Sequence, residues 1–481
     1  MRLSQVMPGG SDFTSHPQRP DPEIAALALD TRRVGPGTLF FCVPGFTRDG
    51  HEFAPDAVAR GAAALVVERP LGLGVPELCV PSVRAAMPAA AARFFGDPTA
   101  ELTMIGITGT NGKTTTAFII RSLLEGAGRA CGLVGTVKSV VGGRERTAER
   151  TTPEAIDLQG DFRAMVAGGD SACAMEVSSH ALALGRADAI HWDVAVWTNL
   201  GHDHLDFHGD LETYFQAKRR LFCADGVTRV VNVDDPSGRR LAEEFPDAVT
   251  IALERDAEWR VTHLDGGQIA TRFRAETPEG EVELTVPLPG RFNVLNALGA
   301  AAAVRAVGVG LETIAAVLPR AERVPGRFEP VDAGQEFAVI VDYSHEPDAL
   351  ENVLRAAREL VPGRVTVVFG AGGDRDRVKR PVMGEVASRL ADRAIVTSDN
   401  PRSEDPEAIV AEVLAGAARG TESIVDRRAA IERALDGAGP GDLVLIAGKG
   451  HEQGQELAGG RKVPFDDREV ARESLARVVA R

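Results

Sequence analysis

Short, predominantly apolar runs recur along the whole chain and alternate with segments whose apolar positions have helical spacing. Runs of this length, bounded by glycine, proline or polar residues, are typical of buried strands in parallel sheets. The runs expected to form strands are residues 40–43, 63–67, 102–107, 172–177, 194–198, 337–341, 364–369, 394–397 and 443–447. The segments expected to form helices include residues 54–60, 84–95, 117–124, 214–222 and 293–319. The pattern predicts an α/β protein.

The length of 481 residues predicts about three domains at roughly 150 residues each. A proline-containing turn at 98–100 marks a boundary near residue 100. Strand and helix patterns alternate regularly in the last third of the chain, which predicts a doubly wound sheet. We therefore expect a small N-terminal α/β domain over 1–100, a central parallel-sheet domain over 101–325 and a doubly wound C-terminal domain over 326–481.

Two segments depart from this alternation. Residues 269–274 and 282–286 alternate apolar and polar positions on either side of a Pro-Glu-Gly sequence. This spacing predicts a hairpin at the edge of the central domain. Residues 1–22 are rich in proline, glycine and polar side chains and are expected to form an irregular entry to the first domain.

The stretch 105–116 carries the strongest chemical signal, because a predicted strand, a glycine-rich loop and a predicted helix follow one another. Its pattern, Gly109-x-x-Gly112-Lys113-Thr114, is shorter than the usual G-x-x-x-x-G-K-[ST] phosphate loop. Backbone N–H groups and the dipole at a helix N-terminus favour an anion, and Lys113 adds a positive charge. A following threonine hydroxyl can reach a phosphate-bound Mg²⁺. The stretch predicts a nucleoside triphosphate site rather than an ordinary strand-to-helix turn.

Polar residues elsewhere in the central domain suggest metal ligands. Glu176 leaves a predicted strand and is either a Mg²⁺ ligand or a cap for the next helix. Residues 199–208 hold three histidines and two aspartates, which fit a zinc site, a magnesium site or an exposed polar loop. Lys218, on the amphipathic segment 214–222, is by itself a solvated lysine.

In the C-terminal domain, polar segments follow the predicted strands at 342–345, 370–377, 398–402 and 448–452. Ligands of doubly wound sheets bind beyond the carboxyl ends of the strands. The segment 398–402, Ser-Asp-Asn-Pro-Arg, offers an acid, an amide and a guanidinium. A zwitterion needs acceptors for its ammonium group and a guanidinium for its carboxylate, so an amino-acid site is expected here. Turns with surface ion pairs are the alternative.

The composition narrows the class of protein. Lys+Arg 54 against Asp+Glu 69 gives a net charge of −15, which disfavours broad attraction to nucleic acid or to anionic membranes. The five cysteines have no C-x-x-C spacing, which is typical of a reducing compartment. No stretch has the length of a signal peptide core or a transmembrane helix, so a cytoplasmic protein is expected.

Six motifs together resemble the Mur ligases of peptidoglycan synthesis, and they occur in family order over nearly the whole chain. The motifs are Gly109-Thr-Asn-Gly-Lys-Thr-Thr, Met175-Glu-Val-Ser-Ser-His, the segment 199–208, Ala217-Lys218, Gly290-Arg-Phe-Asn-Val-Leu-Asn296 and Asp342-Tyr-Ser-His345. The resemblance implies a UDP-sugar-binding domain over 1–100, a phosphate-loop ATPase domain over 101–325 and a Rossmann-like, amino-acid-binding domain over 326–481. It also implies ATP and Mg²⁺, small-molecule substrates and a monomer.

The Asp399-Asn-Pro-Arg402 loop resembles the branch of the family that adds meso-2,6-diaminopimelate to UDP-N-acetylmuramoyl-L-alanyl-D-glutamate. Lysine lacks the second carboxylate of diaminopimelate, so it would leave donors of such a site unpaired. Two positions depart from relatives, Leu184 where some carry glutamine and Glu346 where threonine is common.

The resemblance assigns residues to each ligand. For ATP these are Gly109, Thr110, Asn111, Gly112, Lys113, Thr114, Thr115, Asn293, Arg327 and Asp342. For the UDP-sugar they are Leu29, Thr31, Phe46, Thr47, Arg48, Thr151, Thr152, Ser178 and Arg186. For diaminopimelate they are Arg375, Asp399, Asn400, Pro401, Arg402, Gly448 and Glu452.

The implied chemistry is ATP-dependent amide formation through an acyl phosphate, with Lys113, Glu176, His204 and Lys218 as catalytic residues. The implied metal ligands are Thr114, Glu176, His204 and Lys218, the last as a carbamate. The alternatives are a lysine-adding Mur ligase, a folylpolyglutamate-synthetase-like ligase and a nucleotide-dependent switch. Folylpolyglutamate synthetases typically have Gly-Lys-Gly-Ser in the phosphate loop, whereas this chain has Gly112-Lys-Thr-Thr115. GTPase switches have an Asn-Lys-x-Asp segment, which this chain lacks.

Overall fold

The computed structural model describes residues 1–8 and 21–479. Most of the predicted irregular entry, residues 9–20, lies outside the described residues, whereas Leu3–Val6 form a short helix, α1. The chain divides into two compact units that interleave along the sequence. The first consists of Met1–Thr108, Gly128–Val196 and Glu212–Arg229, and the second of Gly109–Ala127, Trp197–Leu211 and Val230–Arg481. The boundaries of the three expected domains stay a prediction.

The N-terminal part of the first unit is a four-stranded parallel sheet. Its strands, in order, are β1 (Ala26–Ala28), β2 (Thr38–Phe41), β3 (Ala62–Val67) and β4 (Glu77–Cys79). Helices α1 and α3 (Val83–Phe94) belong to one hydrophobic cluster and α2 (Ala54–Ala59) to another. Side chains alternate between these clusters along β3, so the strand is buried on both faces, as its uninterrupted apolar sequence predicts.

The same unit contains strands in the order β10-β5-β9-β6-β7-β8. Their bounds are β5 Thr103–Thr108, β6 Cys131–Val134, β7 Lys138–Val141, β8 Arg144–Thr147, β9 Ala172–Glu176 and β10 Val194–Trp197. Strand β9 pairs in parallel with β5 and β6, so the carboxyl ends of all three lie at one edge. Gly106 within β5 has a packing reason, because a Cβ there would lie 2.8 Å from the Trp192 ring.

The helices of this unit include α5 (Ala155–Ala167), α6 (Ser179–Ala183) and α8 (Leu211–Arg219), which is followed by a 3-10 turn over Arg220–Cys223.

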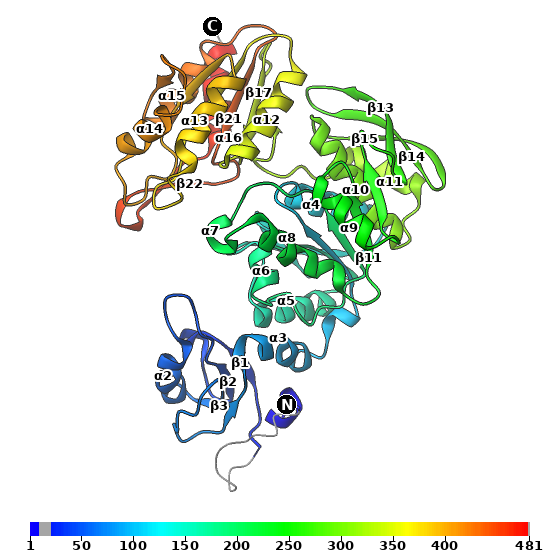
Figure 1. Ribbon diagram of the computed structural model, residues 1–481, viewed down its shortest axis with the longest axis vertical. Helices are drawn as coiled ribbons and strands as arrows, with labels where there is room; N and C mark the ends of the chain where they lie inside the picture. Colours follow the sequence, from blue (N-terminus) through cyan, green and yellow to red (C-terminus); the bar gives the residue numbers. More distant parts are fainter. Residues whose placement is uncertain (9–20, 480–481) are drawn as a thin grey trace. The chain divides into compact units, whose positions relative to one another are not determined.

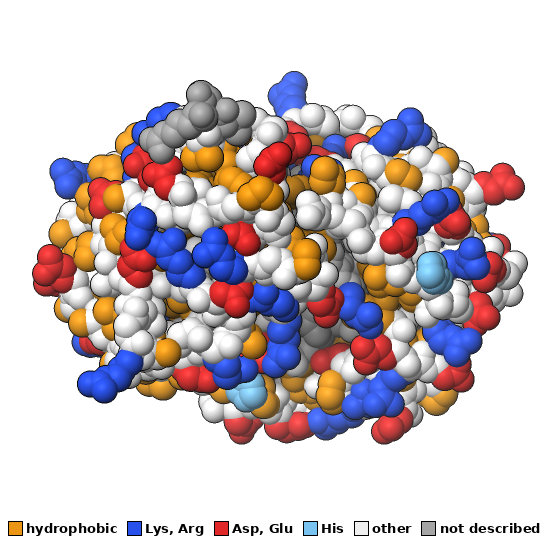
Figure 2. Space-filling model, turned by 90° about the horizontal axis from the view of Figure 1, so that it is seen from above, with side chains coloured by type: hydrophobic (Ala, Val, Ile, Leu, Met, Phe, Trp, Pro, Cys, Tyr) orange, Lys and Arg blue, Asp and Glu red, His pale blue; other side chains and the backbone are white. Residues whose placement is uncertain are grey.

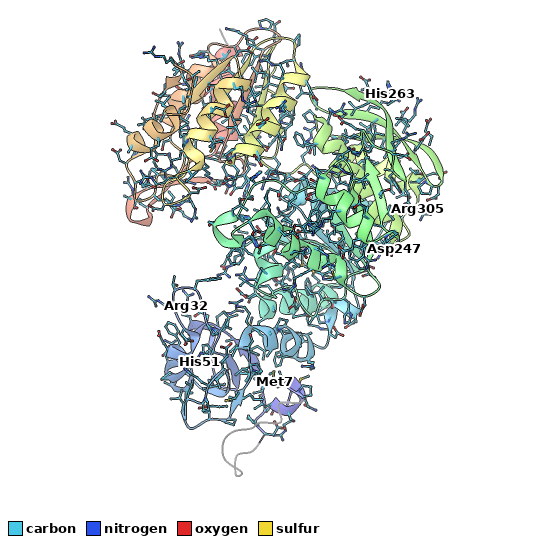
Figure 3. All side chains as sticks on the ribbon, viewed as in Figure 1. Met7, Arg32, His51, Asp247, His263 and Arg305 are labelled. Carbon is cyan, nitrogen blue, oxygen red and sulfur yellow. The ribbon has the colours of Figure 1, made fainter. Side chains whose placement is uncertain are left out.

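The part of this unit that contains the four-stranded sheet, called here the N-terminal sheet domain, has a buried histidine, His51, which is 3% exposed (Figure 3). Its Nε2 accepts a hydrogen bond from Glu68 N at 2.9 Å, and its Nδ1 lies 2.6 Å from Asp49 Oδ1. His51 therefore ties the turn after β2 to the end of β3.

The second unit contains α4 (Lys113–Gly126), which packs against α10 (Arg291–Ala306), and five strands in the order β15-β14-β13-β12-β11. The five strands are β11 Thr228–Asn232, β12 Val249–Ala252, β13 Trp259–Gly266, β14 Thr271–Thr277 and β15 Gly280–Val286. Strands β14 and β15 form the predicted hairpin at the edge of the sheet, with Arg272 opposite Thr285. The segment predicted to be helical over 293–319 is two helices, α10 and α11 (Leu311–Val317), because Gly308 has φ +95° between them.

The C-terminal part of this unit is a six-stranded sheet with helices on both faces (Figure 1). Its strands, in order, are β16 (Glu329–Pro330), β17 (Ala338–Asp342), β21 (Leu443–Ala447), β18 (Val365–Phe369), β19 (Arg393–Val396) and β20 (Glu422–Ser423). All pairs are parallel except β16–β17. Helices α12 (Pro347–Leu360), α13 (Lys379–Leu390) and α14 (Pro406–Leu414) cover one face, and α15 (Arg427–Leu435) and α16 (Asp467–Val479) cover the other.

Strand β21 shows why the sheet is covered on both sides. Leu443, Leu445 and Ala447 pack with α12–α14, whereas Val444 and Ile446 pack with α15 and α16. A strand buried on both faces reads as an uninterrupted apolar run, as this one does. The predicted doubly wound sheet is confirmed.

Charged surface is dispersed on the face seen in Figure 2, where acidic and basic side chains are intermixed with hydrophobic ones. Within residues 1–8 and 21–479, no helix combines the length and apolar composition that crossing a bilayer requires.

A fully buried ion pair joins the first residues of α15 and α16. Arg427 donates through Nε to Asp467 Oδ1 at 2.8 Å and through Nη2 to Asp467 Oδ2 at 2.7 Å, and both side chains have 0% exposure. Arg427 Nη2 also donates to Ala447 O at 2.9 Å, at the carboxyl end of β21. The pair therefore connects two helix N-termini to the central strand of the sheet.

We expect Asp467→Ala to destabilise the C-terminal sheet by about 3–5 kcal/mol, because it leaves a buried guanidinium without its counter-charge. The double variant Arg427→Met/Asp467→Leu should recover most of this loss, since well-packed apolar side chains replace buried ion pairs at little net cost. Hydrogen–deuterium exchange of the β21 amides measures the local free energy of opening. Wild-type protection in the single variant would contradict this role of the pair.

Candidate active site

The loop between β5 and α4 has a backbone that only glycine allows at two positions. Gly109 has φ +147° and Gly112 has φ +84°. A Cβ on Gly109 would lie 1.9 Å from Thr198 Oγ1, and one on Gly112 would lie 2.3 Å from Asn296 Oδ1. The shortened glycine spacing therefore reflects two close approaches that leave the loop backbone open to a ligand.

Lys113 is the first residue of α4, and its ammonium group lies over the loop. Its Nζ donates to Gly109 O at 2.9 Å and to Thr110 O at 2.8 Å. Thr114 and Thr115 follow in the first turn and are 5% and 7% exposed. A positive charge, hydroxyl groups and a helix N-terminus thus coincide, as a phosphate site requires.

The segment after β10 holds this loop in place. Asn199 accepts from Thr110 N through its backbone O at 2.8 Å and from Asn111 N through Oδ1 at 2.9 Å. Its Nδ2 donates to Asn111 O at 3.2 Å, and Thr198 Oγ1 donates to the same oxygen at 2.6 Å. Asn232 Nδ2 donates a hydrogen bond to Thr198 O at 2.8 Å and so holds Thr198 in place. The sequence pattern indicates 199–208 only as candidate metal ligands and does not predict this clamp, although the position of Asn199 directly after a strand is a signal for it.

Two further residues assigned to ATP support the loop or its surroundings. Asn293, 1% exposed, accepts from Asn296 Nδ2 at 3.2 Å, and Asn296 underlies Gly112. Asp342 accepts from Phe328 N and from Ser344 N, each at 2.7 Å, so its carboxylate holds two segments of backbone.

Arg327 lies in an aromatic cluster at the carboxyl end of β17. Its guanidinium carbon is 4.4 Å from the centroid of the Tyr343 ring, and the His451 ring lies 4.9 Å from that centroid on another loop. Burial raises the pKa of Tyr343, and burial followed by the Arg327 charge lowers the pKa of His451 to about 4. Glu346, one of the two departures, forms an ion pair with Lys379 and so has a partner within the fold.

Glu176 is held rigidly at the carboxyl end of β9. The residue is 1% exposed, and its carboxylate accepts from Thr136 N at 2.7 Å and from Thr136 Oγ1 at 3.0 Å. A Cβ on Gly135 would lie 2.5 Å from Glu176 Oε1, so glycine makes room for this oxygen. A fixed carboxylate is a hard oxygen donor, which fits Mg²⁺. Thr136 was not predicted, although it follows a strand that ends at the same edge.

Four of the nine residues assigned to the UDP-sugar lie together around Glu176. Thr151 Oγ1 lies 3.0 Å from Thr136 Oγ1, and Thr152 Oγ1 donates to Glu176 O at 2.8 Å. Ser178 N donates to Thr152 Oγ1 at 3.1 Å, and Arg186 Nη1 donates to Thr152 O at 3.4 Å.

The other five lie on the N-terminal sheet domain. Leu29 and Thr31 follow β1, and Thr31 begins a 3-10 turn whose Arg33 lies 2.5 Å from Asp157 Oδ1 of α5. Phe46, Thr47 and Arg48 are exposed on the turn between Pro44 and Asp49, with Phe46 80% exposed. The Arg33 ion pair connects the turn that begins at Thr31 to α5.

Three arginines surround one buried glutamate beside these residues. Glu154 is 8% exposed and lies 2.9 Å from Arg186 Nε, 3.0 Å from Arg150 Nη1 and 3.4 Å from Arg84 Nη1. Three positive charges around one negative charge favour an anionic group nearby. The sequence does not predict this cluster, because Arg84 lies 70 residues before Glu154 and only the fold brings it to the local pair of Arg150 and Glu154.

His204 and Lys218 belong to different compact units. His204 has φ +56° and precedes α7 (Leu205–His208), and its Nδ1 lies 3.2 Å from Asp203 Oδ1. Lys218 is 1% exposed, with Nζ 4.5 Å from the centroid of the Tyr214 ring, so its interpretation as a solvated lysine is wrong. Among the described residues, no group of three or more His, Cys, Asp and Glu side chains is arranged as a metal site.

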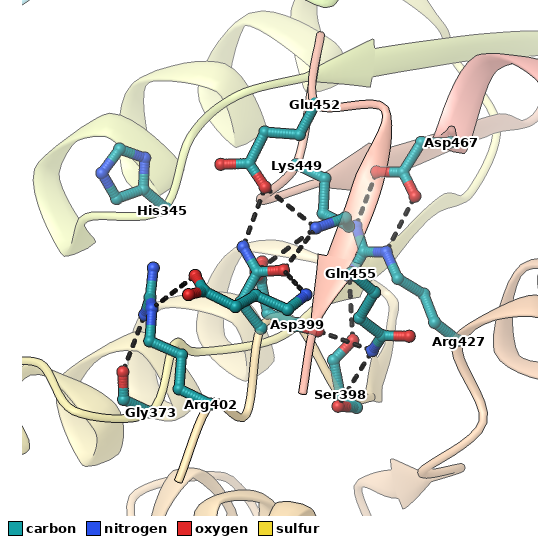
Figure 4. A network of polar contacts seen from close by, with 12 residues as sticks. His345, Gly373, Ser398, Asp399, Arg402, Arg427, Lys449, Glu452, Gln455 and Asp467 are labelled. Carbon is teal, nitrogen blue, oxygen red and sulfur yellow. Dashed lines mark hydrogen bonds and ion pairs between the residues drawn. The ribbon is translucent and has the colours of Figure 1, made fainter. Parts of the chain in front are cut away.

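The candidate amino-acid site lies at the carboxyl ends of β18, β19 and β21 (Figure 4). Asn400 Nδ2 donates to Glu452 Oε2 at 2.8 Å, and a Cβ on Gly448 would lie 2.6 Å from Asp399 Oδ2. Arg402 has φ +50° and donates through Nη1 to Gly373 O at 2.7 Å.

The tertiary structure thus brings five of the seven candidates together. They are Asp399, Asn400, Arg402, Gly448 and Glu452. Pro401 packs on the preceding loop, where a Cβ on Gly373 would lie 1.9 Å from Pro401 O. Arg375 is exposed on that loop. Sequence reasoning missed Lys449, Gln455 and Glu456, which interleave with these candidates.

Three family models match successive parts of the chain. They are the Mur ligase family catalytic domain over 23–94, the Mur ligase middle domain over 107–304 and the Mur ligase glutamate ligase domain over 326–450.

A relative from Geobacillus kaustophilus, UDP-N-acetylmuramoyl-L-alanyl-D-glutamate--2,6-diaminopimelate ligase, is 49% identical over 467 residues, or 95% of each chain. A solved structure of an enzyme of the same name has a TM-score of 0.72 and 33% identity, covering 100% of this chain and 99% of that chain. A MurF ligase from Thermotoga maritima, solved in complex with ADP, shares the fold at a TM-score of 0.64 and 20% identity, covering 94% of this chain and 96% of that one.

We expect Asn199→Ala to weaken nucleotide binding about tenfold, because two side-chain hydrogen bonds to the loop, each worth about 0.5–1.5 kcal/mol, are lost. Isothermal titration with ATP and with ADP measures the affinity. Asn352→Ala, at an exposed position of α12, is the control and should bind as the wild type does. Equal nucleotide affinities of the two variants would contradict the role of Asn199 in holding the loop.

The lowered pKa of His451 predicts a pH dependence of stability. The unfolded chain binds a proton near the ordinary value of 6.5, whereas the folded protein binds it only near 4. The free energy of unfolding should therefore decrease as the pH falls from about 6.5 towards 4. The variant His451→Phe keeps a ring but cannot ionise, so it should lose this part of the dependence. Thermal unfolding of both proteins at several pH values tests this, and parallel curves would contradict it.

Proposed function

The chain belongs to the Mur ligase family, and we propose that it is the ATP-dependent ligase that adds meso-2,6-diaminopimelate to UDP-N-acetylmuramoyl-L-alanyl-D-glutamate in peptidoglycan synthesis. The relatives named above support the reaction. The observation that carries the choice of amino acid is the assembly of Asp399, Asn400, Arg402 and Glu452 at one edge of the C-terminal sheet.

Amide formation needs an activated carboxylate, because carboxylate oxygen is a poor leaving group. In the proposed course, the free carboxylate of the D-glutamyl residue attacks the γ-phosphorus of ATP, which forms an acyl phosphate and releases ADP. The amine of diaminopimelate then attacks the acyl carbon, and phosphate leaves together with an amine proton. The loop amides of 109–112 and Lys113 neutralise the phosphates and hold the anionic reactants in line.

The family resemblance implies two Mg²⁺ ions, and the donor atoms of the candidate side chains are of kinds that can bind this metal. In this proposal the buried carboxylate of Glu176 and the hydroxyl of Thr114 would supply oxygen donors to one ion, and His204 and a carbamylated Lys218 would bind the second. Bound Mg²⁺ would neutralise charge on the phosphates. Carbamylation of the buried Lys218 by CO₂ would convert a cation into a carboxylate able to bind metal.

In this proposal, the first unit binds the anionic nucleotide-sugar substrate. Thr151, Thr152, Ser178 and Arg186 offer hydroxyl, amide and guanidinium groups around Glu176. Arg84 and Arg150, with Arg186, add positive charge beside them. Such groups suit the carboxylates of the D-glutamyl residue.

A lysine-adding ligase is the closest alternative, and the guanidinium of Arg402 argues against it. Glu456 and Gly373 O hold the guanidinium in place, and its remaining N–H groups can bind a carboxylate. Lysine carries no second carboxylate for them, so the site favours diaminopimelate. A folylpolyglutamate-synthetase-like ligase or a nucleotide switch does not bind diaminopimelate, so neither alternative accounts for the polar groups of the loop 399–402. The cytoplasmic location and the monomeric state stay predictions.

We expect ADP release by the wild type to require both the UDP-muramoyl dipeptide and diaminopimelate, and to be slow when lysine replaces diaminopimelate. Arg402→Ala should raise KM for diaminopimelate about tenfold or more while KM for ATP stays within about twofold, since a charge-assisted bidentate contact is lost. A coupled ADP assay measures both. Lys113→Ala, expected to be inactive although folded, is the control for the nucleotide site. ADP release that ignores the amino acid would contradict ligase activity, and equal KM changes would remove Arg402 from recognition.

A further inference from the structure

Lys449 is a buried lysine within the candidate amino-acid site, and neither the family motifs nor the predicted contacts assign it a role. It follows β21 between Gly448, with φ +119°, and Gly450, with φ +53°. A Cβ on Gly450 would lie 2.6 Å from Gly326 O and 2.7 Å from Tyr343 Cβ, so this turn is tightly packed. The tight backbone and the 0% exposure of Lys449 show that its side chain lies inside the protein.

The ammonium group of Lys449 connects the two loops that carry the candidate diaminopimelate contacts (Figure 4). Its Nζ donates to Asn400 Oδ1 at 2.9 Å and to Glu452 Oε2 at 2.9 Å, and it lies 3.9 Å from Asp399 Oδ1. Since these partners surround a group with three donors, Lys449 is placed to organise the site rather than to bind the substrate itself.

One consequence concerns the orientation of Asn400. Its Oδ1 accepts from Lys449 Nζ and from Glu456 N at 2.9 Å, so its Nδ2 must face Glu452, to which it donates at 2.8 Å. Glu456 in turn accepts from Arg402 Nε at 3.0 Å. Lys449 thus fixes an amide whose orientation decides where donors and acceptors lie in the site.

A second consequence concerns charge. Asp399, Glu452 and Glu456 bring three negative charges, and Arg402 and Lys449 bring two positive charges, which leaves the group at −1. The neighbouring pair of Arg427 and Asp467 is neutral as a whole. Without Lys449 the group would be at −2, and its potential would attract a cation more strongly.

We propose that Lys449 is a positioning residue that also selects against lysine, by adding a buried positive charge where the far end of the amino acid binds. This inference rests on the proposed function. The far end of diaminopimelate is a zwitterion with no net charge, whereas that of lysine is a lone ammonium group. A fixed ammonium beneath the site therefore repels lysine more than diaminopimelate, in addition to the carboxylate that Arg402 recognises.

The test compares kcat/KM for diaminopimelate with kcat/KM for lysine in the full-length enzyme with saturating ATP and UDP-muramoyl dipeptide. In Lys449→Met, the ratio should fall about tenfold or more, with part of the fall coming from a gain with lysine, because a like charge is removed. KM for ATP should stay within about twofold. Lys449→Gln, which is neutral but forms hydrogen bonds, is the second variant and should show the same direction if the methionine variant folds poorly.

Two controls separate charge from packing. Lys449→Arg keeps the positive charge and should keep the rejection of lysine even where its size raises KM for diaminopimelate. Lys379→Met removes another buried lysine of the same domain, one that donates to His345 O at 2.9 Å and pairs with Glu346. It should lower the unfolding temperature without changing the ratio.

An unchanged ratio in both neutral variants would overturn the proposal, as would an equal fall in Lys449→Arg or in Lys379→Met. Failure of the function itself has a different signature, because wild-type ADP release would then be independent of diaminopimelate. A fall confined to the neutral Lys449 variants, together with measurable turnover of lysine, is the result that supports charge selection.

Discussion

Parallel pairing is the constraint on which the candidate sites depend, because it brings the ends of strands that are far apart in the sequence to one edge. Ile107 lies opposite Glu176, and Asp342 lies opposite Ala447. The segments that follow such strands then lie close together in space, although they are far apart in the sequence. A shift of one residue in a register would turn each neighbouring side chain to the opposite face of its sheet. The apolar strands, buried on both faces, hold these registers and thereby hold the chemistry.

Close backbone approach is the second requirement, and glycine meets it at the loops. Gly109 and Gly112 let the phosphate loop lie against Thr198 and Asn296, and Gly448 lets β21 end beside Asp399. At these positions a side chain would collide within the fold before any ligand arrived. Asparagine clamps complete the arrangement, because Asn199 satisfies backbone groups that the tight loop cannot pair within itself.

Charge acts locally in this protein. A net charge of −15 would repel nucleotides and acidic sugars at long range, but screening limits such effects to about 10 Å. The charges that matter most are buried or partly buried, where the dielectric is low. They are Lys113 over its loop, Arg84 and Arg186 beside Glu154, and Lys449 between Asn400 and Glu452. Each cation has partners within the fold, which keeps its position fixed before the substrate binds.

Hydrophobic periodicity and short motifs are local properties of the chain, so they were enough to predict the α/β class, most strands and helices, the edge hairpin, the phosphate loop and the family. The sequence could not reveal that Lys218 is buried, that Thr136 holds Glu176, or that Asn199 clamps the loop at Thr110 and Asn111. It also gave no sign of Lys449 as an internal cation. Burial and partner choice depend on which distant segments the sheets bring together, and only the tertiary structure decides that.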